Sequence, residues 1–259
     1  MLDSLYAGSL ADSDERQVSV SSSQLEALAL ESAAALDAIS FFSDVSHIGV
    51  IAEIKRASPT KGDLAMIADP AGLGILYEQA GASAISVLTE QRSFKGSLDD
   101  LKVVRAACKV PVLRKDFICN EYQILEARAH GADIVLLIAA GLEDNVLIRL
   151  KAFTESLGMT AFLETHNRAE VEFAAAIGAR LVGINARDLK TFETDRALFA
   201  SLVGYLPKST IKVAESAVRN SQDVMDYAAA GADCVLVGEA LVTGNPMELI
   251  SSFTQIPKV

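Results

Sequence analysis

The sequence predicts an α/β fold, a (β/α)8 barrel, and three observations indicate it. The dipeptide Gly-Ala recurs four times, each time between a helical pattern and an apolar run. A polar or charged residue stands where most of the apolar runs end. Eight such runs follow one another along the chain, and they contain Val50, Ile85, Val112, Ile134, Ala161, Val182, Val213 and Val235.

Each step between neighbouring runs has room for one strand and one helix. The shortest step is 21 residues, from Ala161 to Val182, and the longest is 35 residues, from Val50 to Ile85. Strands that alternate with helices at this spacing are parallel and are joined by right-handed crossovers. Eight such units in a chain of 259 residues match the size of one closed barrel.

The ends of the predicted helices carry the expected signals. Glycine follows four of them, at a position where a positive φ costs glycine little: Gly81, Gly131, Gly178 and Gly231. Three helix starts combine a capping residue with a proline or with an acidic residue three positions later: Asp69-Pro70, Ser97-x-x-Asp100 and Asn167-x-x-Glu170. These signals support one helix before each strand.

Residues 1–48 lie outside this repeat. Apolar residues at helical spacing predict two helices joined by a loop, one from Leu2 to Leu10 and one from Leu25 to Leu36, after serines that could cap it. The segment has too few large apolar residues to be an independent domain. We therefore expect an N-terminal helical extension, residues 1–48, packed on a barrel domain, residues 49–259.

The main alternative fold is an open, doubly wound sheet. That fold normally carries a glycine-rich phosphate loop after its first strand. Here the first strand is followed by Lys55-Arg56-Ala57-Ser58-Pro59-Thr60-Lys61-Gly62, which contains no G-x-G-x-x-G. The closed barrel is favoured.

Composition narrows the possible partners. The formal net charge of -11 argues against nucleic acid or an anionic membrane. The first basic residue, Arg16, comes too late for a secretory signal, and the longest apolar run, Ile134 to Leu142, is too short to span a bilayer. We expect a soluble cytoplasmic protein whose ligand is a small molecule.

Cysteine and histidine do not form a metal-binding pattern. The chain has three cysteines and three histidines, and their spacing matches neither a zinc motif nor a C-x-x-C pair. We expect free thiols in a reducing compartment and no metal site.

Polar side chains at the predicted strand ends form the candidate site, because a (β/α)8 barrel carries its active site there. Alternate residues of a strand share a face, so Glu53 and Lys55 face the barrel axis if Ala52 and Ile54 face the helices. The other strand ends carry Thr89-Glu90, Lys115-Asp116, Glu164, Asn185, Glu215-Ser216 and Gly238-Glu239.

Two interpretations of these residues are open. Any single one could be a solvated rim residue or part of a structural ion pair. Buried charged networks are weak stabilisers, however, so three glutamates, two lysines and an asparagine on one rim favour catalysis. The ends of the last two strands, at Ser216 and Gly238, also suggest backbone amides that bind phosphate, although Gly238 could serve only a tight turn.

The chain closely resembles the indole-3-glycerol phosphate synthase family over about residues 48 to 245. Two of the matching segments, the one that contains Glu53 and Lys55 and the one that contains Lys115, are specific for this family in combination. The matching segments are Ile51-Ala52-Glu53-Ile54-Lys55-Arg56-Ala57-Ser58-Pro59, Ser86-Val87-Leu88-Thr89, Phe94-Lys95-Gly96-Ser97-Leu98, Val112-Leu113-Arg114-Lys115-Asp116-Phe117, Glu121-Tyr122-Gln123, Gly183-Ile184-Asn185-x-Arg187-Asp188-Leu189, Glu215-Ser216 and Val237-Gly238-Glu239.

The resemblance implies a carboxy-lyase of tryptophan biosynthesis. Its substrate would be 1-(2-carboxyphenylamino)-1-deoxyribulose 5-phosphate, which closes its ring, loses carbon dioxide and water, and becomes indole-3-glycerol phosphate. The family uses no cofactor and no metal. Oligomeric state is left open between a monomer and a weak homodimer.

The resemblance also implies roles for individual residues. Lys115 would be the general acid of ring closure, kept protonated by neighbouring carboxylates. Lys55 and Glu164 would share the proton transfers of dehydration, with the division between them open. Glu53, Asn185 and Glu215 would orient hydroxyls and hold the lysines.

Substrate binding is implied for a further set of residues, and the loop from Lys55 to Gly62 is a plausible lid. Leu136 and Leu189 could equally be plain core residues. The set comprises Ser58, Pro59, Phe94, Phe117, Leu136, Arg187, Leu189, Ser216, Ala217, Gly238 and Glu239.

One departure from the family pattern concerns Ala217, which stands where the family usually has glycine after Glu-Ser. If this position needs a positive φ, alanine adds strain of about 1 kcal/mol. If it only offers an amide to phosphate, alanine serves almost as well. A milder difference is Ala186, between Asn185 and Arg187.

Two other functions compete with this one. Another phosphosugar barrel, such as phosphoribosylanthranilate isomerase, would need a cysteine at the C-terminal end of a strand, and none is expected there. A silent barrel that only binds a phosphorylated ligand is the second alternative. An intact Lys115 and Glu164 argue against it, and Ala217 is the one feature in its favour.

Overall fold

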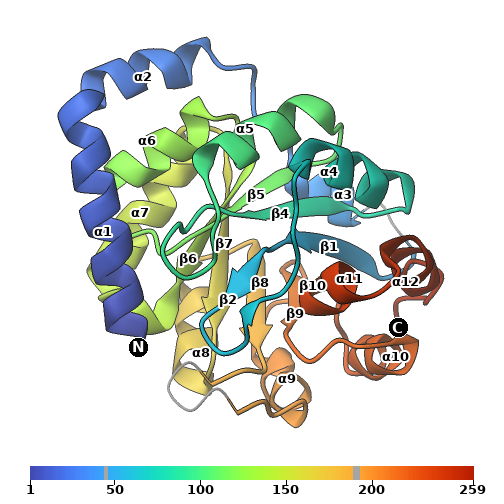
Figure 1. Ribbon diagram of the computed structural model, residues 1–259. Coiled ribbons are helices and arrows are strands. Elements are labelled where there is room, and N and C mark those ends of the chain that lie inside the picture. The colour runs from blue at the N-terminus through green and yellow to red at the C-terminus, as the bar shows by residue number, and fades with distance from the viewer. Residues whose placement is uncertain (44–45, 189–192) are drawn as a thin grey trace.

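The computed structural model describes residues 1–43, 46–188 and 193–259. These residues form a closed barrel in which eight parallel strands pair in the order β1-β10-β9-β8-β7-β6-β5-β4, with β4 closing on β1 (Figure 1). The predicted fold class is confirmed. The barrel strands are β1 (Gly49–Ile54), β4 (Ala84–Leu88), β5 (Val112–Lys115), β6 (Ile134–Ile138), β7 (Thr160–Thr165), β8 (Leu181–Asn185), β9 (Ile211–Glu215) and β10 (Cys234–Val237).

Helices cover the outside of the strands. The unit after β10 has two helices, and two short 3-10 turns, η1 (Ala139–Gly141) and η2 (Val203–Tyr205), interrupt the repeat. The barrel helices are α4 (Pro70–Gln79), α5 (Leu98–Ala107), α6 (Glu121–Ala129), α7 (Asp144–Ser156), α8 (Arg168–Ala176), α9 (Ala197–Leu202), α10 (Ser221–Ala229), α11 (Glu239–Thr243) and α12 (Pro246–Phe253).

The predicted helix signals are confirmed at both ends. The side chains of Asp69, Ser97 and Asn167 accept hydrogen bonds from backbone N–H groups in the first turns of α4, α5 and α8. The four Gly-Ala glycines all have positive φ, between 68° and 104°. Each helix therefore ends abruptly and the chain enters the next strand within a few residues.

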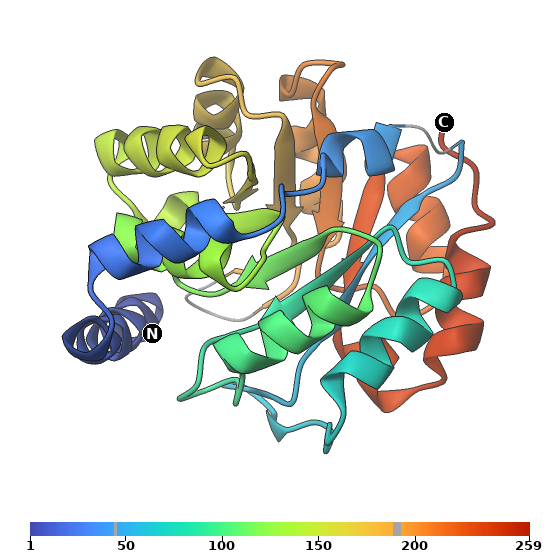
Figure 2. The same ribbon diagram turned by 90° about the horizontal axis from the view of Figure 1, so that it is seen from above.

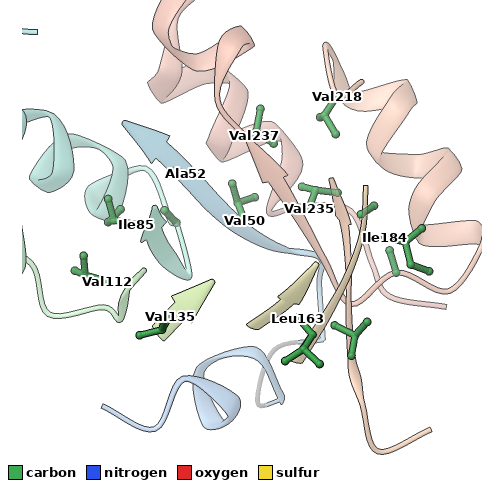
Figure 3. Close-up of a cluster of buried hydrophobic side chains, with 14 of the residues drawn as sticks. Val50, Ala52, Ile85, Val112, Val135, Leu163, Ile184, Val218, Val235 and Val237 are labelled. Carbon is green, nitrogen blue, oxygen red and sulfur yellow. The ribbon is translucent and has the colours of Figure 1, made fainter. Parts of the chain in front are cut away.

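Strand alternation divides the core into two layers. In β1, Val50, Ala52 and Ile54 belong to an outer cluster shared with the helices, and Ile51 belongs to an inner cluster within the barrel. Figure 3 shows residues of the outer cluster on several strands. This alternation is what turns Glu53 inward, as the sequence predicts.

The N-terminal segment contains a helix that the sequence analysis missed. Helices α1 (Leu2–Ser19) and α2 (Ser22–Glu31) lie on one side of the barrel, beside α6 and α7 (Figures 1 and 2). A third helix, α3 (Ala38–Ser43), packs Phe42 into the inner cluster of the barrel. Six residues are too few to show a helical period, so the pattern gave no signal.

The loop after β1 folds into a short antiparallel hairpin, β2 (Ala57–Ser58) and β3 (Gly62–Asp63), drawn in front of the barrel strands in Figure 1. Gly62, the first residue of β3, has φ 67°. Among the described residues, no helix is long and apolar enough to cross a membrane.

Phe42→Ala should destabilise the protein strongly, because the ring is fully buried at 0% exposure. We expect a loss of about 3–5 kcal/mol in the free energy of unfolding, measured by urea denaturation. Val18→Ala is the control, since Val18 is 89% exposed and its truncation should change stability by less than about 0.5 kcal/mol. Equal effects of the two variants would mean that α3 does not anchor the barrel.

Candidate active site

A cavity of about 780 Å³ opens at the C-terminal ends of the strands. Leu189 lies outside the described residues, and Thr89 and Glu90, which follow β4, do not line this cavity. Every other residue with an implied catalytic or binding role lines it. They are Glu53, Lys55, Ser58, Pro59, Phe94, Lys115, Phe117, Leu136, Glu164, Asn185, Arg187, Glu215, Ser216, Ala217, Gly238 and Glu239. The barrel thus brings together residues that are up to 186 positions apart, from Glu53 to Glu239.

Lys115 lies between two buried glutamates. Its Nζ donates a hydrogen bond to Oε2 of Glu164 at 3.1 Å and lies 3.6 Å from Oε2 of Glu215. The three side chains come from β5, β7 and β9, and both carboxylates are 2% exposed. A second ion pair joins Nζ of Lys55 to Oε1 of Glu53 at 2.8 Å. The inward charges are therefore paired, as burial requires.

These contacts set the protonation of the cluster. Burial opposes the charge on Lys115, but Glu164 and Glu215 outweigh it and raise the pKa of the ammonium above its ordinary value. Burial also opposes ionisation of Glu164, yet Lys115 lowers the pKa of this carboxyl. Burial and the neighbouring Glu164 raise the pKa of Glu215. Glu164 is therefore the ionised partner of the charged lysine, and Glu215 is the carboxyl that takes up a proton first.

Asn185 links this cluster to the loop after β9. Its Nδ2 donates to Oε1 of Glu164 at 3.0 Å, and its Oδ1 accepts from Ser216 Oγ at 2.7 Å and from the backbone N–H of Arg187 at 3.0 Å. With both ends of the amide engaged, the Glu164 carboxylate has a fixed orientation.

Two glycines provide space for the carboxylates. A Cβ on Gly183, in β8, would overlap Oε1 of Glu215 and the ring of Phe162. A Cβ on Gly238 would overlap Oε1 of Glu53 and approach Nζ of Lys55 to 3.1 Å. Gly238 has φ -121°, which any residue can adopt, so close packing rather than a tight turn requires glycine there.

The loop after β9 holds two consecutive residues in the left-handed region, Ser216 at φ 69° and Ala217 at φ 57°. The Ser216 hydroxyl is bonded to Asn185, and the Ser216 carbonyl oxygen accepts from the Tyr227 hydroxyl at 3.3 Å. The conformation that disfavours alanine is therefore present at Ala217, and side-chain hydrogen bonds on its neighbour help to hold it.

The opposite wall of the cavity is apolar. Phe94 and Phe117 lie with ring centroids 6.1 Å apart, and Leu136 is 1% exposed within the inner core. The N-terminal helix α1 adds Leu2 and Leu5 to this wall. The sequence analysis predicted the aromatic and Leu136 contributions and missed the two leucines, whose helical spacing showed only that α1 has an apolar face.

A buried network behind β5 was also missed. Arg114 is fully buried, and its guanidinium bonds Asp116 Oδ2 at 3.0 Å and the Gln123 carbonyl oxygen at 2.5 Å. Ser9 Oγ, from α1, donates to the other oxygen of Asp116 at 3.0 Å. Arg114 lies between two inward residues of β5. The alternation of the strand could therefore have indicated from the sequence that Arg114 points toward the helices.

The hairpin after β1 is tied to the cavity rim by exposed ion pairs. Lys61 pairs with Glu239 at the start of α11, and Lys95 Nζ lies 2.5 Å from Asp63 Oδ1. Exposed pairs of this kind contribute little stability. They can therefore open without a large cost.

Comparison with known proteins identifies the family. The family model described as indole-3-glycerol phosphate synthase matches residues 2–251. The chain belongs to the indole-3-glycerol phosphate synthase family. A relative of that name from Mycolicibacterium vanbaalenii is 54% identical over 252 residues, covering 97% of this chain and 92% of the relative. One from Leifsonia xyli subsp. xyli is 53% identical over 253 residues, covering 98% and 97%.

Solved structures show a similar fold at low sequence identity. An N-acetylmannosamine-6-phosphate 2-epimerase from Clostridium perfringens matches with a TM-score of 0.61 and 16% identity, over 82% of this chain and 94% of that one. A 3-hexulose-6-phosphate synthase from Salmonella typhimurium matches with a TM-score of 0.59 and 15% identity, over 80% and 97%. These two similarities support the barrel alone.

Ala217→Gly should stabilise this member of the family, because φ of 57° strains alanine and not glycine. We expect the free energy of unfolding to rise by about 1 kcal/mol or less, since glycine also gains freedom in the unfolded chain. The matched control is Ala229→Gly in α10, an exposed helical position, where stability should fall by about 0.5–1 kcal/mol. A loss of stability in both variants would show that Ala217 is not strained.

Proposed function

We propose that the protein converts 1-(2-carboxyphenylamino)-1-deoxyribulose 5-phosphate into indole-3-glycerol phosphate, a carboxy-lyase step of tryptophan biosynthesis. The observation that carries this proposal is Lys115, held charged between Glu164 and Glu215 in a cavity with one apolar wall. The reaction needs an acid of this kind beside the aromatic ring of the substrate. Family membership supports the same reaction.

Ring closure requires a protonated donor held beside the ketone oxygen. The carboxyl-bearing ring carbon is a weak nucleophile, so the ketone oxygen must receive a proton as the new carbon–carbon bond forms. Lys115 donates that proton, and the ketone becomes a hydroxyl. The raised pKa of Lys115 keeps the donor loaded, and the adjacent carboxylates stabilise the cation before the transfer.

Two further steps complete the reaction. The ring carbon loses carbon dioxide, and the bonding electrons restore the aromatic ring. The new hydroxyl then leaves as water when it is protonated, while a base removes a proton from the neighbouring methylene carbon, so that the carbon–carbon double bond of the indole forms and the nitrogen keeps its proton. Glu164 suits the base because Lys115 lowers its pKa and so keeps it ionised, and Lys55, beside Glu53 at 2.8 Å, suits the acid.

The remaining polar groups orient the substrate. Asn185 fixes the carboxylate of Glu164, and Oε1 of Glu215 is buried with no hydrogen-bond partner among the described residues. Glu215 lines the cavity, and its carboxyl group can bond a hydroxyl of the ribulose chain. Arg187 and Ser58 also line the cavity. Arg187 adds a cation and Ser58 adds a hydroxyl to the polar side of the cavity.

The substrate has an aromatic end and a phosphate end, and each end has a matching side of the cavity. The carboxyphenyl ring packs against Phe94, Phe117, Leu136 and Pro59, with which only apolar contact is available. The phosphate binds backbone amides near Ser216, Ala217, Gly238 and Glu239, at the start of α11, with Lys55 as a cation.

We further propose that the protein works in the cytoplasm, as a monomer or weak homodimer, without a cofactor or metal. Among the described residues, no three His, Cys, Asp or Glu side chains are placed to hold a metal ion. The isomerase alternative is not favoured, since Cys234 begins β10 at the other end of the barrel.

Lys115→Ala should lower kcat by about 10²–10⁴-fold, the usual contribution of a positioned acid. The chain has no tryptophan, so indole fluorescence from the product rises against a dark background. Lys102→Ala, at an exposed position of α5, is the control and should retain wild-type turnover. Absence of product with the wild-type protein would refute the synthase activity, whereas equal rates for Lys115→Ala and wild type would refute only the role of Lys115.

A further inference from the structure

His166, the first residue after β7, lies behind the Glu164 carboxylate. Its Nε2 is 3.2 Å from Oε1 of Glu164, and Lys115 faces the other oxygen, Oε2, at 3.1 Å. The imidazole is 10% exposed and does not line the cavity among its described residues. It therefore contacts a candidate catalytic group without being placed to touch the substrate.

A third carboxylate completes a row. Nδ1 of His166 lies 3.4 Å from Oε2 of Glu170, in the first turn of α8, and the backbone N–H of His166 donates to that same oxygen at 2.7 Å. The other oxygen of Glu170 accepts from Asn167 Nδ2 at 2.5 Å. A carboxylate at the N-terminal turn of a helix is stabilised by the helix dipole, so Glu170 is a firm anchor for the imidazole.

An imidazole between two carboxylates is expected to be charged. Burial opposes the charge on His166, but Glu164 and Glu170 outweigh it and raise the pKa of the imidazole to about 10. A histidine with this raised pKa stays an imidazolium throughout the neutral range and loses its charge only as the pH rises toward 10. Both ring nitrogens then carry protons, and each lies close to a carboxylate oxygen, Nε2 at 3.2 Å and Nδ1 at 3.4 Å.

The charge balance around Lys115 indicates what this imidazolium can do. Lys115 alone faces two buried carboxylates, Glu164 and Glu215, and one ammonium cannot hold both ionised at low cost. His166 adds a second cation on the Glu164 side only. Other groups that act on this cluster are Tyr6, which is uncharged, and Glu53 beside Lys55.

We propose that His166 is a positioning residue, an imidazolium that fixes the orientation of the Glu164 carboxylate and makes Glu164, rather than Glu215, the proton acceptor of the reaction. The assignment rests on the proposed function, in which Glu164 is the base of the dehydration step. Glu170 in turn holds His166 in place, so the row Glu170, His166, Glu164 runs from the helix layer to the cavity.

Protonation of His166 is measured in the wild-type protein by NMR of carbon-13-labelled histidine, with the three histidine signals assigned by His→Gln variants. We expect the His166 signal to stay in the imidazolium form from about pH 6 to about pH 9. His130 is the internal control, because burial lowers its pKa. A His166 signal that is neutral at pH 7 overturns the proposal, and this readout does not depend on the reaction catalysed.

His166→Gln tests the consequence for catalysis, since glutamine keeps an N–H donor and removes the charge. We expect kcat to fall about 10-fold or more with KM changed less than about 3-fold, because part of the acid–base contribution is lost. The acid limb of the kcat–pH profile should move upward by about one pH unit, as Glu164 loses a neighbouring cation. Glu170→Gln should shift the limb in the same direction by less, and His47→Gln, at an exposed position, should leave it unchanged.

A merely structural role of His166 predicts a different result. In that case His166→Gln lowers the unfolding temperature and the amount of active protein, and the kcat–pH profile of the remaining enzyme matches wild type. That outcome overturns the proposal. If His166→Gln does not fold, an unshifted profile for Glu170→Gln overturns it instead. Inactive wild-type protein would refute the proposed function and leave the NMR result standing.

Discussion

The compensation of buried charge at one end of the barrel is the constraint on which the rest of the site depends. Glu53, Glu164 and Glu215 are each 4% exposed or less at the side chain, and each lies within reach of a lysine. An inward carboxylate without a cation would be neutral, and an inward lysine without a carboxylate would lose its proton. These three ion pairs therefore define which groups can give a proton and which can accept one.

Close packing around these charges shapes the backbone as well. Gly183 and Gly238 leave room for the carboxylates of Glu215 and Glu53, so the barrel wall is thinned where charged groups fill its interior. Behind the wall, the fully buried Arg114 binds Asp116, and Ser9 of α1 bonds the same carboxylate. The N-terminal helix is thus fastened one residue away from Lys115, and it also supplies Leu2 and Leu5 to the apolar wall.

Much of this arrangement followed from local patterns. The helix caps, the Gly-Ala turns and the alternation in β1 are short-range features, so the strands and the inward direction of Glu53 and Lys55 could be predicted. Helix α3 was missed because six residues show no period, and the hairpin of β2 and β3 was missed because two-residue strands carry no pattern. The position of His166 beside Glu164 depends on how the chain turns after β7. The three histidines are scattered in the sequence, so their spacing did not indicate this contact.

By itself, the sequence determined the fold class, the strand ends and the set of residues that share one rim, because parallel strands in a closed barrel place all their C-terminal ends on the same face. Only the tertiary structure decided how the charges are partnered. Distances of 3.1 Å and 3.6 Å from Lys115 to its two glutamates arise between residues far apart in the chain. Their pKa values depend on burial and on those distances, and neither can be read from the order of residues.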